Sequence, residues 1–417
     1  MEILVQKYGG SSVATLERVH HVARRIAESH RAGCHTVVVV SARGDTTDEL
    51  LRLAGETSAT RPPREVDQLL ASGECASAAL LAIALNGLGV PAVSLTGPQA
   101  GVRAAGRHGA GVIASVQTRR IRRLLERGNV VVVAGFQGLN AGGDIVTLGR
   151  GGSDTTAVAL AAELRAGRCE IYTDVPGVLT ADPRVVPTAR VLPVVDAAVM
   201  AEMAFAGARV LHPRSVELAA MERIEVYVRG TFTSGPGTVI PGGVDVNELE
   251  TRGVVVAVTH DLDVARVLVH CRGARRDLAG DVLGVLAAGG VPVDLVARSG
   301  PYEDEFRMGF TMRRSDAAEL APALHRTAAA LGGAVRIEEN IGKLSVVGMG
   351  LLSRPEYTAR TLAALSAAGI GTSWLSTSQL RTSVTVPLDR VLDAVEVLHR
   401  EFELDREPTA LDAMTAV

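Results

Sequence analysis

Lysine is nearly absent from this chain of 417 residues: only Lys7 and Lys343 are lysines, and the rest of its 43 Lys and Arg residues are arginine. Where arginine supplies almost every positive charge, a retained lysine indicates a site that needs a compact point charge. Lys7 ends an apolar segment and precedes a glycine turn, so we interpret it as functional. Lys343 lies at the edge of a predicted strand, where retention by chance is the simpler interpretation.

Aromatic residues make up only 3% of the chain, and no run of basic residues contains interleaved aromatics. The densest basic segment, 119–123, is interrupted by Ile121 and has the pattern of an amphipathic helix, so we interpret its arginines as a solvated face. Together with a formal net charge of -3, this pattern excludes nucleic acid as the main partner.

Cysteine is also scarce, and long hydrophobic runs are missing. The four cysteines lie far apart, without a CxxC motif, at Cys34, Cys75, Cys169 and Cys271. Such spacing predicts reduced thiols. No uninterrupted apolar run approaches the length of a membrane span, which is about 20 residues. We therefore expect a cytoplasmic protein with no membrane partner and no metal site of its own.

Hydrophobic residues, in contrast, make up 47% of the sequence, enough for two or three domains with sizeable cores. Within residues 1–243, apolar runs such as 36–40 and 129–134 alternate with helical patterns. Strands in which apolar residues do not alternate with polar ones are buried on both faces. We therefore predict an α/β domain whose mainly parallel sheet is covered by helices on both faces. Ligands bind at the carboxyl ends of such strands.

The glycine-rich stretch 135–164 follows one of these strands and continues into an Ala/Leu-rich helix that we expect to begin near Ser153. Its glycines allow a ligand to approach the backbone, and Ser153 and Asp154 are suited to cap the helix. A well-capped helix after a flexible turn would explain the glycines alone. Arg150, one turn before the carboxylate of Asp154, favours a site for a zwitterionic ligand instead.

A second combination of strand, glycine turn and helix surrounds Lys7. Residues 3–6 form a predicted strand, 9–10 a glycine turn and 15–31 a predicted helix. This arrangement presents backbone N–H groups and one ammonium group to an anion. Short glycine pairs are common, so this motif becomes specific only in the company of the Arg150 loop.

Three further segments carry polar residues. The hydroxyl-rich segment 41–48 follows the strand 36–40 and is predicted to be a loop. Ser72-Gly73-Glu74 is predicted to interrupt a helical region, and a solvated face does not explain Glu74, because the residues after it are apolar. His212 precedes a proline at a predicted helix start, which favours a structural role over acid–base chemistry.

The C-terminal part contains a repeat. Two strand–helix–strand patterns, with first strands at 266–270 and 344–348, have helices that end in Ala-Ala-Gly at 287–289 and 367–369. They predict two βαββαβ modules of the ferredoxin-like kind, which expose sheet edges that can pair. Neither copy contains a candidate nucleophile, base or metal cluster, so sensing or dimerisation is the expected role.

The order of these motifs resembles that of the aspartokinases. The motifs are KYGGSS at 7–12, GDTTD at 44–48, SGE at 72–74, GFQG at 135–138, TLGRGGSD at 147–154, TD at 173–174, DPR at 182–184 and HPRS at 212–215. The repeat is similar to their paired ACT domains. The resemblance implies an amino acid kinase domain at 1–243, a linker at 244–252 and ACT-like domains at 253–330 and 331–410.

The resemblance implies that ATP, with Mg²⁺, phosphorylates the β-carboxylate of L-aspartate to give 4-phospho-L-aspartate. This is the first step toward lysine, threonine and methionine, or toward a specialised aspartate-derived product. It also implies a homodimer formed through the ACT domains, joined in some relatives by a shorter ACT-only subunit. Two alternatives stay open: another amino acid kinase of the same fold, such as a glutamate kinase, and a non-catalytic effector-binding protein.

The resemblance also implies site residues. Those for catalysis are Lys7, Gly10, Arg150 and Asp154. Those for aspartate are Thr47, Glu74, Phe136, Arg150, Gly151, Ser153 and Asp154. Those for ATP are Lys7, Gly9, Gly10, Ser11, Thr173, Asp174, Leu179, Arg184 and Arg209. Those for an effector are Arg298, Ser299, Ser376 and Thr377.

In these implied roles, Lys7 bridges the phosphates of ATP and the reacting carboxylate. Arg150 holds the α-carboxylate of aspartate as a bidentate pair, and Glu74 with Asp154 holds its α-ammonium group. Mg²⁺ is held mainly by phosphates and water.

The chain departs from the family pattern at several positions. Leu179 replaces a usual tyrosine near the adenosine, Arg209 a usual lysine and Arg43 a usual methionine. In the first ACT-like copy, Arg276-Asp277 replaces a usual Pro-Gly, and Arg298-Ser299 replaces a usual Gln-Asn pair. Guanidinium groups there would repel a lysine side chain and compete for the effector's carboxylate, so we expect weak or no inhibition by lysine plus threonine.

Overall fold

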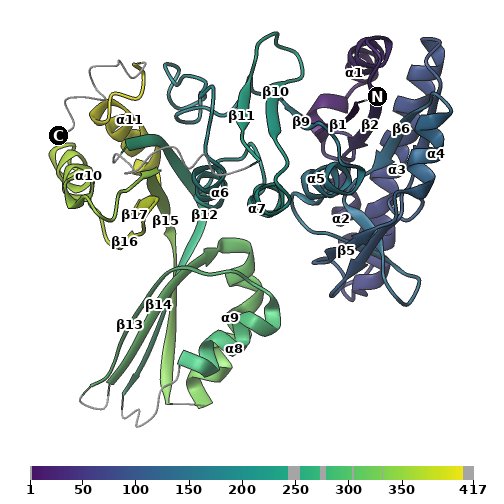
Figure 1. Cartoon of the computed structure of the whole chain (residues 1–417). Helices are drawn as coiled ribbons and strands as arrows, with labels where there is room; N and C mark the ends of the chain where they lie inside the picture. Colours follow the sequence, from purple (N-terminus) through teal and green to yellow (C-terminus); the bar gives the residue numbers. More distant parts are fainter. Residues whose placement is uncertain (1, 243–253, 273–278, 303–304, 331, 407–417) are drawn as a thin grey trace. The chain divides into compact units, whose positions relative to one another are not determined.

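The computed structural model describes residues 2–242, 254–272, 279–302, 305–330 and 332–406 (Figure 1). The chain divides into two compact units. The first contains Met1–Val178, Val191–Phe205 and Arg209–Asn247, and the second contains Leu179–Arg190, Ala206–Ala208 and Glu248–Val417. The predicted linker at 244–252 lies outside the described residues.

A seven-stranded sheet forms the centre of the first unit. Its order is β11-β10-β9-β1-β2-β6-β3, and neighbouring strands are parallel except for β11, which is antiparallel to β10. The strands are β1 (Ile3–Tyr8), β2 (His35–Val40), β3 (Ala92–Leu95), β6 (Val130–Ala134), β9 (Arg168–Thr173), β10 (Val226–Gly230) and β11 (Thr238–Ile240). The valines of β2 and β6 are fully buried. The predicted mainly parallel sheet is confirmed.

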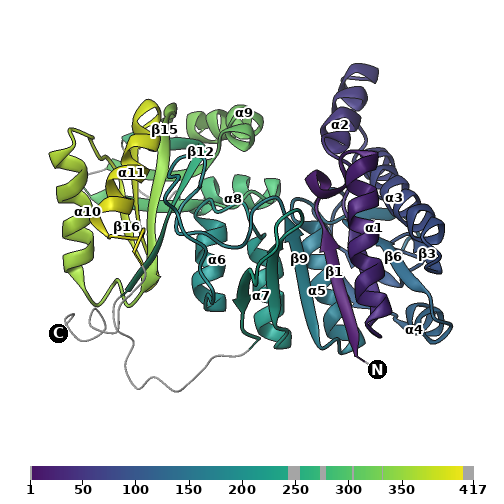
Figure 2. The ribbon, with the colours of Figure 1, turned by 90° about the horizontal axis from the view of Figure 1, so that it is seen from above.

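Helices cover both faces of this sheet. Val38 and Val40 of β2 face a core formed with α1 and α3, and α5 packs over the other face with α7 beside it. Figure 2 shows α1 next to β1. The helices are α1 (Leu16–Arg31), α2 (Thr46–Thr57), α3 (Pro63–Gly87), α4 (Arg119–Glu126), α5 (Gly152–Leu164), α6 (Ala197–Phe205) and α7 (Pro213–Glu222), with a 3-10 turn, η1 (Gly10–Val13).

Helix α3 runs without interruption through Ser72-Gly73-Glu74, where the sequence predicted a break. A Cβ added at Gly73 would lie 2.9 Å from Cβ of Ala42. Close packing therefore outweighs the low helix propensity of glycine. By length and composition alone α3 could cross a membrane, but more than half of its apolar window is buried in the first unit, as expected of a core helix.

A second, four-stranded sheet in this unit was not predicted. Its order is β5-β4-β7-β8, and its strands are β4 (Val102–Ala105), β5 (Val112–Val116), β7 (Gln137–Leu139) and β8 (Ile145–Thr147). β7 and β8 form an antiparallel hairpin inside the stretch that we interpreted as a loop. Strands of three residues carry too short an alternation to be recognised in a sequence.

Helix α5 begins at Gly152, and its N-cap residue is Gly151. The prediction that Ser153 and Asp154 cap this helix is therefore wrong, since both lie in its first turn. The φ angles of Gly149 and Gly151 are 73° and 69°, a left-handed conformation that glycine adopts without steric cost. Asp154 consequently lies at the positive end of the helix dipole, where a carboxylate is stabilised.

The second unit is built on an antiparallel sheet with the order β13-β14-β12-β15-β17-β16. The strands are β12 (Val254–Arg272), β13 (Asp294–Tyr302), β14 (Glu305–Arg313), β15 (Gly333–Met349), β16 (Leu375–Thr377) and β17 (Arg381–Pro387). The two long strands, β12 and β15, pair along both of their halves. The start of β12 therefore supplies the fourth strand of the second module, and the two ferredoxin-like modules are interleaved.

Each module covers its part of this sheet with two helices. In the first module, α8 (Ala279–Gly289) and α9 (Arg314–Ala330) lie next to each other (Figure 1), and both pack over Phe306 and Phe310. In the second, α10 (Pro355–Ala367) lies beside α11 (Val391–Glu401), which follows the turn η2 (Leu388–Arg390) (Figure 2), and both pack over Leu344 and Val346. The predicted pair of ferredoxin-like modules is confirmed.

Lys343 is buried rather than displayed at a strand edge. It is 4% exposed, and its Nζ lies 2.9 Å from Asp294. Arg381 pairs with the same carboxylate at 2.9 Å. Burial would raise the pKa of Asp294, but the hydrogen bonds and charges of Arg381 and Lys343 hold it well below its usual range. Retention of Lys343 by chance is therefore the wrong interpretation, because a buried ammonium group needs its partner.

Candidate active site

Lys7 and Asp154 form an ion pair at the centre of the candidate site. Lys7 lies near the carboxyl end of β1, and its Nζ is 2.6 Å from Oδ1 of Asp154 in the first turn of α5. The two side chains are 12% and 10% exposed, so solvent and salt screen their charges less than at the surface. Two residues predicted to act on one reaction thus lie in direct contact.

The glycine turn after β1 meets the loop after β2. A Cβ added at Gly10 would lie only 2.7 Å from the carbonyl oxygen of Ala42, so this position requires glycine. Gly44 N donates a hydrogen bond to Gly10 O at 3.0 Å. Gly9 and Ser11 flank this contact, and Ser11 is exposed. Backbone N–H groups of such a turn are suitable donors to a phosphate.

Glu74 reaches the same loop from α3. Its Oε1 accepts a hydrogen bond from Ala42 N at 3.1 Å, and its buried Oε2 has no hydrogen-bond partner among the described residues. Burial raises the pKa of this carboxyl from 4.5 to about 7, and the hydrogen bond from Ala42 opposes the rise. An unpartnered buried carboxylate oxygen indicates a place for a cationic ligand group.

Arg150 is exposed in the loop between β8 and α5. The next residue, Gly151, packs against His212: a Cβ added there would lie 2.1 Å from Cβ of His212. His212 is the N-cap of α7, and its Nδ1 accepts from Arg214 N at 3.3 Å. This capping supports the structural interpretation of His212 and fixes the position of the loop that carries Arg150.

Three other predicted aspartate-binding residues lie in or near α5 and α2. Ser153 is buried against Gly135, where an added Cβ would lie 2.8 Å from Ser153 Oγ. Phe136 has a φ angle of 68°, which is strained for a residue with a side chain. Thr47 lies half-buried in the first turn of α2, because this helix begins inside the predicted hydroxyl-rich loop.

Thr173 and Asp174, predicted for ATP, lie at the end of β9. Thr173 Oγ1 donates to Asp174 Oδ1 at 3.1 Å. The preceding Tyr172 stacks on Tyr8 of β1, with ring centroids 4.7 Å apart and an interplanar angle of 4°. The ends of β1 and β9 are therefore held side by side, next to Lys7.

Leu179 and Arg184, also predicted for ATP, belong to the second unit. Ala181 and Val186 of the same segment are buried in the core of the second module. The guanidinium group of Arg184 binds the carboxylate of Asp182 at 2.9 and 3.0 Å. These two residues therefore belong to a different unit from Lys7, Thr173 and Asp174, and their role in nucleotide binding stays a prediction.

Two departures from the family pattern occupy different surroundings. Arg209 is exposed in the turn that precedes α7. Arg43 donates from Nε to Val13 O at 3.2 Å and from Nη2 to Ala14 O at 2.9 Å. The charge of Arg43 therefore holds the end of η1, which contributes to the shape of the glycine turn.

The predicted effector residues lie at the two edges of the second sheet. Arg298 is exposed on β13, at one edge, while Ser376 and Thr377 lie on β16, at the other. The sheet order therefore does not bring them together within one chain. The Arg276-Asp277 pair and the side chain of Ser299 lie outside the described residues.

One buried carboxylate of the first unit was not predicted from the sequence. Asp67 is 1% exposed on α3 and binds Thr147, the residue that ends β8. A signal was present, since Asp67 precedes Glu74 by seven residues, a spacing that puts both on one face of a helix. The predicted helix break between them concealed it.

Metal ligands are not grouped in the part of the chain that the structure describes, where no three His, Cys, Asp or Glu side chains could hold one ion. The two acids of the site already have other contacts, Asp154 with Lys7 and Glu74 with Ala42. With both carboxylates already in contact with other groups, these residues fit a cation that is bound mainly by the phosphates of a nucleotide.

Comparison with known proteins identifies the families to which the two parts of the chain are similar. Residues 2–230 match the amino acid kinase family, and residues 344–402 match the ACT domain. An aspartokinase of Thermus thermophilus is 42% identical over 408 residues, which cover 97% of this chain and 100% of that protein. The aspartokinase of Mycolicibacterium smegmatis is 43% identical over 415 residues, which cover 99% of this chain and 98% of that protein.

The fold is similar to a solved structure as well. The crystal structure of E. coli aspartokinase III in complex with aspartate and ADP (R-state) has a TM-score of 0.80 and 24% identity, and covers 96% of this chain and 99% of that chain. The kinase-family match over more than half of the chain, together with relatives above 40% identity over nearly all of it, shows that this chain belongs to the aspartokinases, which are ATP-dependent kinases.

Proposed function

We propose that this chain transfers the γ-phosphoryl group of MgATP to the β-carboxylate of L-aspartate, giving 4-phospho-L-aspartate and ADP. The observation that carries the proposal is the ion pair of Lys7 and Asp154. It combines, at one place, an ammonium group for phosphate oxygens and a carboxylate for the amine of an amino acid. The aspartokinase relatives at 42% and 43% identity support the choice of aspartate.

The chemistry requires positioning more than acid–base catalysis. The acceptor carboxylate is already ionised at neutral pH, so the protein must align it with the γ-phosphate and compensate the charge of the transferred group. Asp154 holds the ammonium group of Lys7 at 2.6 Å, which keeps the lysine in place before the nucleotide binds. Glu74 Oε2 would accept from the α-ammonium group, and Arg150 would clamp the α-carboxylate.

The nucleotide would be held from the ends of β1 and β9. The N–H groups of Gly9, Gly10 and Ser11 would bind phosphate oxygens, and Thr173 and Asp174 would contact the nucleotide. Leu179, Arg184 and Arg209 keep their predicted nucleotide contacts in this proposal. Mg²⁺ would enter with ATP, bound mainly by phosphate oxygens and water.

The first experiment measures ADP release by the purified full chain with aspartate, with glutamate and without an amino acid. Release that depends on aspartate supports the proposal. Equal or faster release with glutamate favours another amino acid kinase of the same fold. A folded chain that releases no ADP with either substrate contradicts catalysis and favours the non-catalytic effector-binding alternative.

Regulation by lysine plus threonine would be weak in this chain, and its product would serve lysine, threonine and methionine synthesis or a specialised aspartate-derived pathway. Arg298 adds a cation on β13, where the family usually has an amide pair. A guanidinium group opposes a lysine side chain and competes for the effector's carboxylate.

The proposal also covers the domain organisation and the assembly. We infer a kinase domain at 1–243, a linker at 244–252 and ACT-like domains at 253–330 and 331–410 in a cytoplasmic enzyme. The described strands β13 and β16 have a strand on one side only, and such edges favour pairing between chains. A homodimer, with a shorter ACT-only subunit as a further partner, fits this edge pairing. A monomeric mass in sedimentation at micromolar concentration would exclude it.

A further inference from the structure

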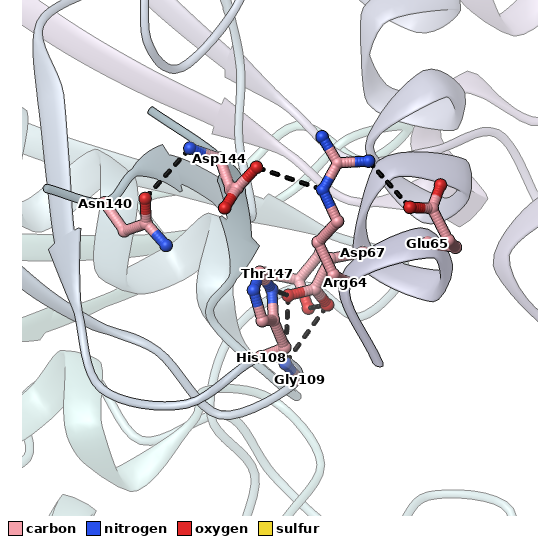
Figure 3. Close-up of polar contacts among 8 residues, drawn as sticks. All are labelled: Arg64, Glu65, Asp67, His108, Gly109, Asn140, Asp144 and Thr147. Carbon is pink, nitrogen blue, oxygen red and sulfur yellow. Dashed lines mark hydrogen bonds and ion pairs between the residues drawn. The ribbon is translucent and has the colours of Figure 1, made fainter. Parts of the chain in front are cut away.

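Asp67, on the buried face of α3, joins three segments of the first unit (Figure 3). Thr147 Oγ1 donates to its Oδ1, and Gly109 N donates to both carboxylate oxygens at 3.1 Å. His108 Nδ1 lies 2.7 Å from Oδ2. Helix α3, the turn between β4 and β5, and the end of β8 therefore meet at one carboxylate that is 1% exposed.

Thr147 directly precedes the glycine loop that carries Arg150. Its carbonyl oxygen accepts from Gly111 N at 2.9 Å. Arg214, at the start of α7, donates to Leu148 O at 2.7 Å and to Gly111 O at 3.0 Å. Two charged side chains thus fix the base of the loop, one through Thr147 and the other through Leu148.

The helix that carries Asp67 also carries Glu74. Their separation of seven residues corresponds to two turns, about 10 Å along the helix axis, and places both side chains on one face. Gln137 of β7 fixes the segment between them, because its Nε2 donates to Ala71 O at 3.0 Å. Helix α3 therefore sets the separation between the Glu74 carboxylate and the loop of Arg150.

We propose that Asp67 is a positioning residue that determines the affinity for aspartate, because it holds the Arg150 loop at a fixed distance from Glu74. The inference rests on the proposed function, in which Arg150 and Glu74 bind the two charged ends of the amino acid. Asp67 itself does not contact the substrate. A carboxylate suits this position, because both of its oxygens accept from Gly109 N, while one also accepts from Thr147 Oγ1 and the other lies beside His108 Nδ1.

Asp67→Asn tests this role with almost no change of shape. Its amide NH₂ group would face Gly109 N, which donates to both carboxylate oxygens and cannot accept, and would push away the turn that holds the end of β8. We expect the KM for aspartate to rise about 10- to 100-fold while the KM for ATP changes less than about twofold. A residue with a purely structural role would lower the amount of folded enzyme and leave both KM values unchanged.

Glu65→Gln is the matched control. Glu65 lies on the same helix, pairs with Arg64 at 2.7 Å, and has a side chain that is 60% exposed (Figure 3). It has no described contact with Thr147 or the Arg150 loop, so both KM values should stay at the wild-type level.

Thr147→Val is the second variant and keeps the test decisive if Asp67→Asn does not fold. It removes one hydroxyl donor, keeps the β-branched shape and should raise the KM for aspartate in the same direction. If the wild-type chain is active but both folded variants keep a KM for aspartate within about twofold of wild type, the inference is wrong and the proposed function stands. If the wild-type chain shows no aspartate-dependent ADP release, the proposed function fails first.

Discussion

A Cβ atom added at Gly151 would lie 2.1 Å from Cβ and 2.2 Å from Cγ of His212. The loop that carries Arg150 and the N-terminus of α7 therefore pack together without room for a methyl group. His212 cannot move aside freely, because its ring accepts the N–H of Arg214 as the cap of α7. This contact links the capping of a helix to the position of the predicted carboxylate clamp.

Gly151→Ala should therefore disturb substrate binding in addition to stability. We expect kcat/KM for aspartate to fall about 100-fold or more, because the methyl group must displace the loop. Gly128→Ala is the matched control: Gly128 also has a positive φ angle, 77°, but a Cβ there would meet nothing within 4 Å. The control should lose about 1 kcal/mol of stability from backbone strain alone and keep wild-type kinetics. Equal kinetics for the two variants would contradict the proposed role of the contact.

Lys7→Ala should remove the charge that compensates the transferred phosphoryl group. We expect a loss of turnover of about 1000-fold or more. The variant also leaves the buried Asp154 without its partner, so its unfolding temperature has to be measured beside its rate. A folded Lys7→Ala enzyme with more than about a tenth of wild-type turnover would assign Lys7 to structure instead.

Arg150→Lys keeps the charge but loses the forked guanidinium group. A bidentate clamp on the α-carboxylate predicts a higher KM for aspartate and a nearly unchanged KM for ATP. Steady-state kinetics with each substrate varied in turn measure both values. A higher KM for ATP with an unchanged KM for aspartate would instead assign Arg150 to the nucleotide site.

The raised pKa of Glu74 predicts that aspartate binding depends on pH. The α-ammonium group requires the ionised carboxylate, whose pKa is raised by burial to about 7. The KM for aspartate should therefore rise as the pH falls from 8 to 6, with a midpoint near 7. Glu74→Gln should have a high KM with no midpoint in this range. An unchanged midpoint in Glu74→Gln would assign the titration to another group.

The same carboxyl makes a prediction about stability. Because its folded pKa is raised, the stability that protonation contributes is fully present below 4.5 and is lost as the pH rises through about 7. At pH 8 the buried carboxylate thus costs on the order of 3 kcal/mol in the ligand-free protein. Denaturant unfolding of Glu74→Gln should show higher stability than wild type at pH 8 and little difference at pH 4. Equal stability at pH 8 would mean that the carboxylate is not desolvated.

Feedback provides a further prediction. Activity measured with saturating substrates should fall little when lysine plus threonine is added at sub-millimolar concentration. Half-maximal inhibition in that range would show that an effector pocket exists despite Arg298 and Arg276-Asp277, and that our placement of the effector residues is wrong.

Much of the first unit could be predicted from the sequence. The valine runs of β2 and β6 contain no polar residues, which requires cover on both faces of the sheet. The helix predicted at 15–31 is α1, which begins directly after its N-cap Thr15. The expectation that Lys7 and Asp154 act together followed from two glycine-rich segments, which come after the predicted strands 3–6 and 129–134. The valine runs and the start of α1 are local features, so a single stretch of sequence carries each of them.

The missed features depend on distant partners. Gly73 suggested a helix break because the contact with Ala42, thirty-one residues earlier, is invisible in the local pattern. Ser153 resembled a cap, but the N-cap of α5 is the left-handed Gly151, two residues earlier. Lys343 looked incidental because its partner Asp294 comes from another strand.

The most direct test of the central claim is to trap the acyl phosphate. Hydroxylamine added to the full chain with MgATP and aspartate should convert the product to a hydroxamate, in an amount equal to the ADP released, for the wild-type chain and not for Lys7→Ala. Aspartate-dependent ADP release without any hydroxamate would contradict phosphorylation of the β-carboxylate. Equal amounts of hydroxamate from wild type and Lys7→Ala would contradict the role of Lys7.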